Sequence, residues 1–431
     1  MSLPDLSPTE VLALQRAAFL IGPALAALAL VAVLEPRPRE ATSAMVGFLW
    51  QLPALLALNM LAAELGWWTF NTPANQLASV PIDVWIGWAL WWGPVAVLAN
   101  RWLPIWALVA VSVGIDLVSM PLLQPLVTLG PMWLAGDAAA MALCLLPGLY
   151  AAKLTREDVK PEQRAMFHVA GWGGYMSFVL PVAALCHEGK ALTALYRLPA
   201  GLACWSVMIA ALLLLFVGIV ATAEFARAGD GTPIPYDPPK RVVSTGPYAF
   251  NANPMQIISA AFMALLAVYA GSWSLAYVAA MFLVFDGIYA AHYNRKHIAH
   301  ALPDAWSAYR GEVEDWKVRW RPHVEGRAEV VISPDGFAHD LWQRAWPWLS
   351  RRMSGAFDVT TGERAKFERL VYRRADAHIE DRGMMAAARI MEHGPLPLAV
   401  LGWAIRFPYL GGALQRLSGL VIHVYRRQRG I

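Results

Sequence analysis

Long apolar stretches alternate with short polar connections through the first 291 residues of the chain. A helix that crosses a bilayer needs roughly 20 mostly apolar residues. Nine stretches meet this requirement: 11–34, 44–64, 78–99, 102–123, 131–152, 166–186, 199–223, 254–271 and 273–291. The pattern therefore predicts an all-α membrane protein with about nine transmembrane helices.

The composition supports this prediction. Hydrophobic residues make up 58% of the 431 residues and charged residues 15%, whereas soluble domains average about 45–50% and about 25%. The modest net charge of +4 suggests no nucleic-acid partner. Cys144, Cys186 and Cys204 have no metal-ligand spacing, so we expect small buried hydrophobic side chains there. The acidic N-terminus lacks a basic region, so we expect no cleaved signal peptide.

Lysine and arginine gather in alternate connections. They follow the first, third, fifth and seventh predicted spans, whereas the connections after the second, fourth and eighth contain neither. By the positive-inside rule, the N-terminus faces outward and the C-terminus lies in the cytoplasm. Lys190 and Arg197, after the sixth span, are an exception. We expect an integral protein of a bacterial inner (plasma) membrane with this orientation.

Three regions follow from the change in composition after Tyr293. We expect an N-terminal transmembrane region of about six spans (1–198), a membrane core with a cytoplasmic loop (199–325) and a small cytoplasmic α/β domain (326–431). In the last region, "AEVVISPDG" predicts a strand and "MMAAARIME" a helix that ends at His393-Gly394-Pro395. Residues 396–427 either lie on the anionic membrane surface or pack on their own domain.

Ionisable residues within predicted spans are candidate functional groups, because charge is costly inside a bilayer. Glu64 and Asp83 are expected at helix ends, and Asp116 and Asp137 in a cavity. His168 and Asp286 complete this set.

The connection 229–256, "GDGTPIPYDPPKRVVSTGPYAFNANPMQ", is unusual for a loop between spans. Its prolines restrict the backbone, Asn253 suits a helix N-cap and Pro254 a first helical turn. Two interpretations remain open. The segment is either a rigid turn with a capped helix, or a lid that holds a polar ligand at the membrane face.

This connection resembles the cofactor-binding region of the isoprenylcysteine carboxyl methyltransferase and phospholipid methyltransferase superfamily, which are membrane enzymes that use S-adenosylmethionine. The matching pieces are "GTP", "DPPK", "GPY" and "NPM", followed by a hairpin at 254–291 and "LPDAWSAYRGEVEDWKVRWRP" at 302–322. The resemblance covers about 224–322. It implies methyl transfer from S-adenosylmethionine to a hydrophobic, membrane-resident acceptor: a lipid, a prenyl compound or a small thiol, amine or carboxylate compound.

The resemblance also implies a set of site residues. The cofactor-binding residues it implies are Gly246, Pro247, Tyr248, Asn253, Pro254, Gln256, Tyr309 and Arg310. Trp316 is a further candidate for the adenosine end, and Lys317 and Arg319 for the cofactor's carboxylate. The catalytic candidates are His292 as a base, Arg295, and Asp286 as a replacement for a missing carboxylate.

Several positions depart from the superfamily's pattern. Ala249 and Ala252 stand where arginines are usual, and Gln256 stands where a tyrosine is usual. The superfamily's Glu-Glu pair falls near Asn294-Arg295. The active site is therefore diverged. Two other functions stay open: a non-catalytic membrane scaffold, and a membrane NADPH-dependent reductase of the sterol type.

The C-terminal region resembles the DCC family of thioredoxin-like thiol-disulfide oxidoreductases. Asp335-Gly336 matches that family's opening motif, but Ala338 and Leu341 occupy its cysteine positions, and no cysteine follows Cys204. Because a thiolate is the nucleophile in disulfide exchange, we expect a degenerate, redox-inert domain. We also expect it to be separable from cofactor binding, since the methyltransferase-like motifs end at Pro322.

Overall fold

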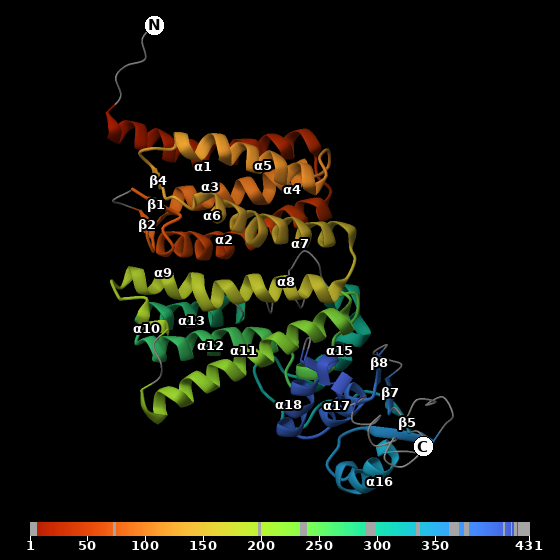
Figure 1. Ribbon diagram of the computed structural model, residues 1–431. Helices are drawn as coiled ribbons and strands as arrows, with labels where there is room; N and C mark the ends of the chain where they lie inside the picture. Colours follow the sequence, from red (N-terminus) through yellow and green to blue (C-terminus); the bar gives the residue numbers. More distant parts are fainter. Residues whose placement is uncertain are drawn as a thin grey trace. The chain divides into compact units, whose positions relative to one another are not determined.

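A computed structural model describes residues 7–71, 75–196, 200–232, 239–285, 287–288, 298–332, 337–361, 370–374, 379–407, 410–414, 416–417 and 420. Helices dominate these residues (Figure 1). The chain divides into two compact units, Met1–Leu198 and Pro199–Pro233 with Pro238–Ile431. Each unit has buried hydrophobic clusters of its own.

The first unit consists of helices joined by short connections, some of which form two small antiparallel strand pairs. Its α-helices are α1 (Pro8–Leu34), α2 (Pro38–Glu64), α3 (Ile82–Leu90), α4 (Ala96–Ala99), α5 (Ile105–Ser119), α6 (Trp133–Ala140), α7 (Leu146–Glu157), α8 (Pro161–Gly174), α9 (Leu180–His187) and α10 (Thr193–Tyr196). Its strands are β1 (Trp68–Phe70), β2 (Gln76–Leu77), β3 (Val80–Pro81) and β4 (Val127–Leu129), and a 3₁₀ turn spans Met120–Leu122.

Seven helical stretches among the described residues are long and apolar enough to cross a membrane: Pro8–Leu34, Pro38–Glu64, Ile82–Ala99, Ile105–Leu122, Trp133–Glu157, Pro161–His187 and Gly201–Gly229. Each overlaps one of the first seven predicted spans. The eighth and ninth predicted spans contain shorter apolar helices, Pro254–Ala270 and Trp273–Phe285. The chain therefore has several helices of membrane-spanning length, and the count of nine is not confirmed.

Three of the long helices contain a π-helical turn beside a proline. These turns are Trp91–Val95, Met141–Leu145 and Tyr175–Val179. Pro94 lies within the first, and Pro147 and Pro181 follow the other two closely. A proline ring clashes with the carbonyl group four residues earlier and provides no N–H, so the helix widens locally instead of ending.

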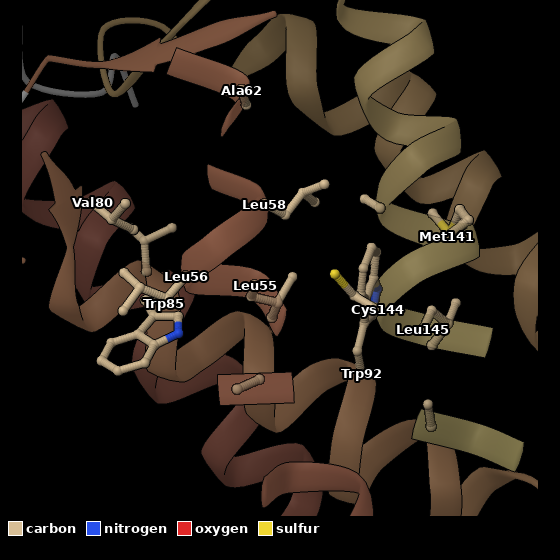
Figure 2. Packing of buried hydrophobic residues seen from close by; sticks show 14 of the residues in the cluster. Leu55, Leu56, Leu58, Ala62, Val80, Trp85, Trp92, Met141, Cys144 and Leu145 are labelled. Atoms are coloured by element: carbon tan, nitrogen blue, oxygen red, sulfur yellow. The ribbon is translucent and has the colours of Figure 1, made fainter. Parts of the chain in front are cut away.

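The core of the first unit forms where α2 meets the helices on either side. Figure 2 shows Leu55 of α2 facing Trp92 and Cys144, which come from two other helical stretches. Asn59, farther along α2, accepts a 2.9 Å hydrogen bond from the indole N–H of Trp68 in β1. Cys144 is buried as expected, whereas Cys186 is exposed, so the expectation of a buried side chain is wrong there.

Small residues allow close helix contacts in this unit. A Cβ atom on Gly87 of α3 would lie 1.8 Å from the Phe19 carbonyl oxygen of α1. A Cβ atom on Gly93 would lie 2.7 Å from the Phe48 Cα atom. Such contacts favour helix association in membranes, where lipid competes with apolar side chains for the helix surface.

The second unit begins with α11 (Gly201–Gly229), α12 (Pro254–Ala270) and α13 (Trp273–Phe285). In Figure 1, α12 lies between α11 and α13, and α12 packs against both. A 3₁₀ turn (Gly246–Ala249) precedes α12, and α15 (Pro303–Glu312) follows the hairpin. Helix α11 continues to Gly229, past the predicted end at 223, so it includes Glu224.

The C-terminal part of the second unit combines strands with helices. Strands β5 (Arg327–Ile332), β6 (Ala356–Thr361), β7 (Val371–Arg374) and β8 (Ile379–Arg382) form a sheet in the order β6-β5-β7-β8. The β5–β6 pair is parallel, with α16 (Phe337–Ser350) between its strands in sequence, and the other pairs are antiparallel. Helices α17 (Met384–Glu392) and α18 (Leu396–Ile405) follow. The strand and helix predicted at "AEVVI" and "MMAAARIME" are present.

We predict that Gly87→Ala destabilises the first unit, because its Cβ atom would collide with the α1 backbone. The cost should be about 1–3 kcal/mol, as for other overpacked sites, and thermal unfolding in detergent measures it. Gly114→Ala in α5 is the matched control, since no described atom lies within 4 Å of its added Cβ. Equal melting temperatures for the two variants would contradict the close α1–α3 contact.

Candidate functional site

The segment 245–253, which we call the donor turn because the resemblance implies a methyl donor there, has a left-handed glycine as its second residue. Gly246 has a φ of +60°, a conformation that residues with a Cβ atom rarely adopt. A Cβ atom there would also lie 2.8 Å from Cγ of Glu224 in α11. Gly246 starts the 3₁₀ turn, Pro247 follows it, and Tyr248 and Phe250 are buried. Glycine is therefore required for both conformation and space.

Asn251 ties the donor turn to the segment after α15. Its side-chain amide nitrogen donates to the backbone carbonyl oxygens of Glu314, Asp315 and Lys317 at 3.3, 2.8 and 3.3 Å. Its side-chain oxygen accepts a 2.8 Å hydrogen bond from the Asn253 backbone N–H. One buried asparagine thus shapes its own turn and holds a segment more than sixty residues away in sequence.

Asn253 does not cap α12 with its side chain, contrary to the prediction. Its amide nitrogen instead donates to the Asp315 carboxylate. The same carboxylate accepts a 2.5 Å hydrogen bond from the Arg310 guanidinium group. Asp315 therefore joins two of the predicted cofactor-binding residues, and Arg310 is already paired with a carboxylate.

Tyr309 braces the donor turn from α15. Its hydroxyl donates a 2.8 Å hydrogen bond to the Tyr248 carbonyl oxygen. Burial raises the pKa of Tyr309 above its ordinary value, so it remains a neutral donor over the physiological range. Beside it, the Arg310 guanidinium lies 5.7 Å from the centre of the Trp306 ring. Tyr309 is thus a structural contact of the turn in this structure.

Backbone hydrogen bonds extend the same contact. The N–H groups of Ala252, Arg319 and His323 donate to the carbonyl oxygens of Glu314, Phe250 and Ala249, respectively, at 3.1, 2.9 and 2.8 Å. The donor turn and the segment 302–322, which lie on either side of the hairpin in sequence, are therefore packed together. Ala252, at a position where the superfamily has arginine, packs in an apolar cluster with Tyr309 and Val313.

Beneath the donor turn lies a buried cluster of charges, which we call the Glu224 network. The Glu224 carboxylate accepts hydrogen bonds from Arg389 at 2.7 Å and from Arg406 at 2.6 Å. It also accepts one from the Thr245 hydroxyl. Both arginines belong to the C-terminal part of the unit, Arg389 in α17 and Arg406 directly after α18.

Two further carboxylates complete the network. Glu392 accepts from both Arg389 and Arg406, and Asp381 accepts a 2.9 Å hydrogen bond from Arg389. Burial alone would raise the pKa of Asp381, but the charges of Arg389, Arg227 and Arg406 lower it below its ordinary value. In this network, ionised carboxylates therefore face charged arginines. The network links residues after 326 to the donor turn, whereas their separability from cofactor binding stays a prediction.

Several buried polar atoms at this site have no hydrogen-bond partner among the described residues. They are the Tyr248 hydroxyl, Nη2 of Arg389 and Nε of Arg406. Burial, followed by the nearby Tyr309 and Glu224, raises the pKa of Tyr248 well above its ordinary value, so this hydroxyl is also neutral. Buried polar atoms are nearly always paired in folded proteins, so such atoms are candidates for contact with a ligand or water.

The other predicted site residues differ in what the structure shows of them. Gly246, Pro247, Tyr248 and Asn253 lie in the donor turn, while Pro254 and the half-buried Gln256 lie in the first turn of α12. Trp316 is exposed, and Lys317 and Arg319 contact Glu314 and Glu312. The proposed catalytic residues His292, Arg295 and Asp286 lie outside the described residues.

The ionisable residues of the first unit form separate contacts. Asp83, in the first turn of α3, accepts a 2.7 Å hydrogen bond from Arg16, and Glu64 ends α2, so both lie at helix ends as predicted. The Asp116 and Asp137 side chains interact with each other. Among the described residues, no group of three or more His, Cys, Asp or Glu could hold a metal ion.

Sequence reasoning missed Glu224, Arg389 and Arg406. An ionisable residue in an apolar helix was the available signal for Glu224, but the predicted span stopped one residue before it. Arg389 and Arg406 carry no such signal, because each occurs in a helix or turn where a surface arginine is ordinary.

We predict that Asn253→Asp destabilises the second unit, because it places a carboxylate against Asp315 and removes the amide donor. The loss should be about 1–3 kcal/mol, the cost of an unsatisfied buried polar group. The double variant Asn253→Asp/Asp315→Asn restores one donor and one acceptor and should regain part of that stability. Thermal unfolding in detergent compares them. An Asp variant as stable as the wild type would instead fit a capping role for Asn253.

No family model, no curated protein and no solved structure matches the chain.

Proposed function

We propose that the protein transfers a methyl group from S-adenosylmethionine to a hydrophobic acceptor that resides in the membrane. One observation carries this proposal. The two motifs that resemble the methyltransferase superfamily lie on either side of a hairpin, and side-chain and backbone hydrogen bonds hold them together in one buried body. Two unrelated turns would not be expected to share these hydrogen bonds.

The reaction is an in-line displacement at the methyl carbon. A bond forms between the acceptor heteroatom and that carbon, the bond from the sulfonium sulfur breaks, and its electron pair stays on the resulting thioether. S-Adenosylmethionine supplies the activated methyl group. The protein therefore has to bind the cofactor, orient it toward the acceptor and exclude water. The donor turn provides a buried rigid backbone and the Tyr248 hydroxyl, which has no partner among the described residues.

The remaining roles belong to this proposal as well. An amine, thiol or hydroxyl acceptor needs a base, for which His292 is the candidate. Asp286 would replace the superfamily's missing carboxylate, and Arg295 is the third catalytic candidate. The α12–α13 hairpin would complete nine membrane passes, with the N-terminus outside and the C-terminus in the cytoplasm of a bacterial inner membrane. The strand order β6-β5-β7-β8 is compatible with a degenerate thioredoxin-like domain, which would be redox-inert because no cysteine follows Cys204.

Cofactor binding without turnover is a second candidate. Ala252 favours it, because this residue fills an apolar cluster where the superfamily has an arginine. No described contact favours the NADPH-dependent reductase, which remains an outcome of the binding test.

The test is isothermal titration of the intact protein in lipid nanodiscs with S-adenosylmethionine and, separately, with NADPH. We expect binding of S-adenosylmethionine only, and transfer of its labelled methyl group to a component of a lipid extract. Binding without transfer would support the non-catalytic candidate. Binding of NADPH alone would overturn the proposal in favour of a reductase.

We predict that Gly246→Ala weakens S-adenosylmethionine binding about tenfold or more, because a left-handed residue with a Cβ atom costs roughly 1–2 kcal/mol and this one also meets Glu224. Gly271→Ala is the matched control. Gly271 has nearly the same φ, +61°, but no described atom lies near its added Cβ. Equal affinities in the two variants would place the cofactor away from the donor turn.

A further inference from the structure

We propose that α17 and α18 act as a built-in latch on the donor turn. In this proposal, Arg389 and Arg406 are positioning residues: through Glu224 they hold the turn closed, and loss of their contact opens it. The consequence for S-adenosylmethionine affinity rests on the proposed function, whereas the consequence for the turn itself does not.

The contacts run in an unbroken series from the C-terminal helices to the donor turn. Arg389 and Arg406 grip the two oxygens of the Glu224 carboxylate. The Glu224 oxygen held by Arg389 also accepts from the Thr245 hydroxyl, at the first residue of the turn. Gly246 follows directly, with its backbone packed against the Glu224 side chain. The side chains of Glu224, Arg389 and Arg406 are at most 5% exposed, and Thr245 and Gly246 are buried.

The charge of Glu224 couples its contact with the two arginines to its contact with Thr245. Glu224, Arg389 and Arg406 are almost completely buried, and the carboxylate has no described cationic partner other than these two arginines. If α17 and α18 moved away, the carboxylate would be left uncompensated in a site of low polarity. It would then draw in water or turn toward solvent, and either change would break its contact with Thr245. The donor turn would lose the support beneath Gly246.

Apolar contacts of α18 reinforce the latch on both motifs. The Trp403 ring meets Phe250 of the donor turn edge-on at 5.6 Å between ring centres. The Leu396 N–H donates a 2.9 Å hydrogen bond to the Trp320 carbonyl oxygen, in the segment that braces the turn from the other side. The same helix therefore reaches both halves of the candidate site, as a latch requires.

The latch gives the cysteine-free C-terminal part a function without redox chemistry. Any event that displaces α17 and α18 would lower the affinity for the methyl donor, and binding of the donor would in turn favour the docked state, because such coupling is reciprocal.

Hydrogen exchange of the intact protein in nanodiscs tests the latch without any added donor. The variants are Arg389→Gln and Arg406→Gln, with Arg382→Gln as the control, since Arg382 is an exposed arginine that pairs with the exposed Glu380. We expect exchange of the Tyr248, Phe250 and Asn251 amides to accelerate at least tenfold in the first two variants and to stay unchanged in the control. These amides donate to carbonyl oxygens within the turn.

A rescue variant separates positioning from general stability. Glu224→Gln combined with Arg389→Gln removes the uncompensated charge, so we expect slow exchange at the donor turn to return. Unchanged exchange in both arginine variants would overturn the latch. Acceleration spread equally over α12 and α17, without rescue, would also overturn it, because it would show general unfolding.

The same variants then report on the methyl donor. We expect Arg389→Gln to weaken S-adenosylmethionine binding about tenfold and the rescue variant to restore it. If the wild type does not bind S-adenosylmethionine but the exchange results hold, the latch stands and the proposed function falls. If the wild type binds and Arg389→Gln leaves both exchange and affinity unchanged, the proposed function stands and the latch falls.

Discussion

The paired carboxylate of Glu224 is the interaction on which the second unit depends. It occurs near the end of a long apolar helix, where an ion without a partner is unstable. Removing one partner of a buried ion pair typically costs about 3–5 kcal/mol, which is a large share of a domain's total stability. Arg389 and Arg406 compensate this charge from elements far along the chain. Glu224 thus joins the C-terminal helices to the donor turn, because it also contacts Thr245 and lies against Gly246.

The donor turn shows how a loop can be held in one conformation without regular secondary structure. Its backbone groups are satisfied by Asn251, by the segment after α15 and by the 3₁₀ turn itself. Local residues supply the left-handed Gly246 and Pro247, but distant residues supply most of the hydrogen-bond partners. For the proposed cofactor, a turn assembled in this way would be pre-organised, because little conformational entropy would remain to be lost on binding.

Most of the membrane part of the fold could be predicted from the sequence, because hydrophobic length is a local property. Helix starts were less predictable. Helix α1 begins at Pro8 rather than at 11 because Ser7 and Glu10 form a capping box. The role of Asn253 could not be predicted from its position before Pro254, since its partner Asp315 lies beyond the hairpin. The contact between the C-terminal part and the donor turn was not predicted for the same reason: the sequence around Arg389 gives no sign of the carboxylate with which it pairs.

Electron cryo-microscopy of the intact protein in nanodiscs would test most directly whether distant elements assemble the donor turn. The account predicts continuous side-chain density from Arg389 and Arg406 to Glu224, with the Asn251 amide against the carbonyl groups of 314–317. A map in which α17 and α18 fold apart from α11, with Glu224 facing solvent or lipid, would contradict it.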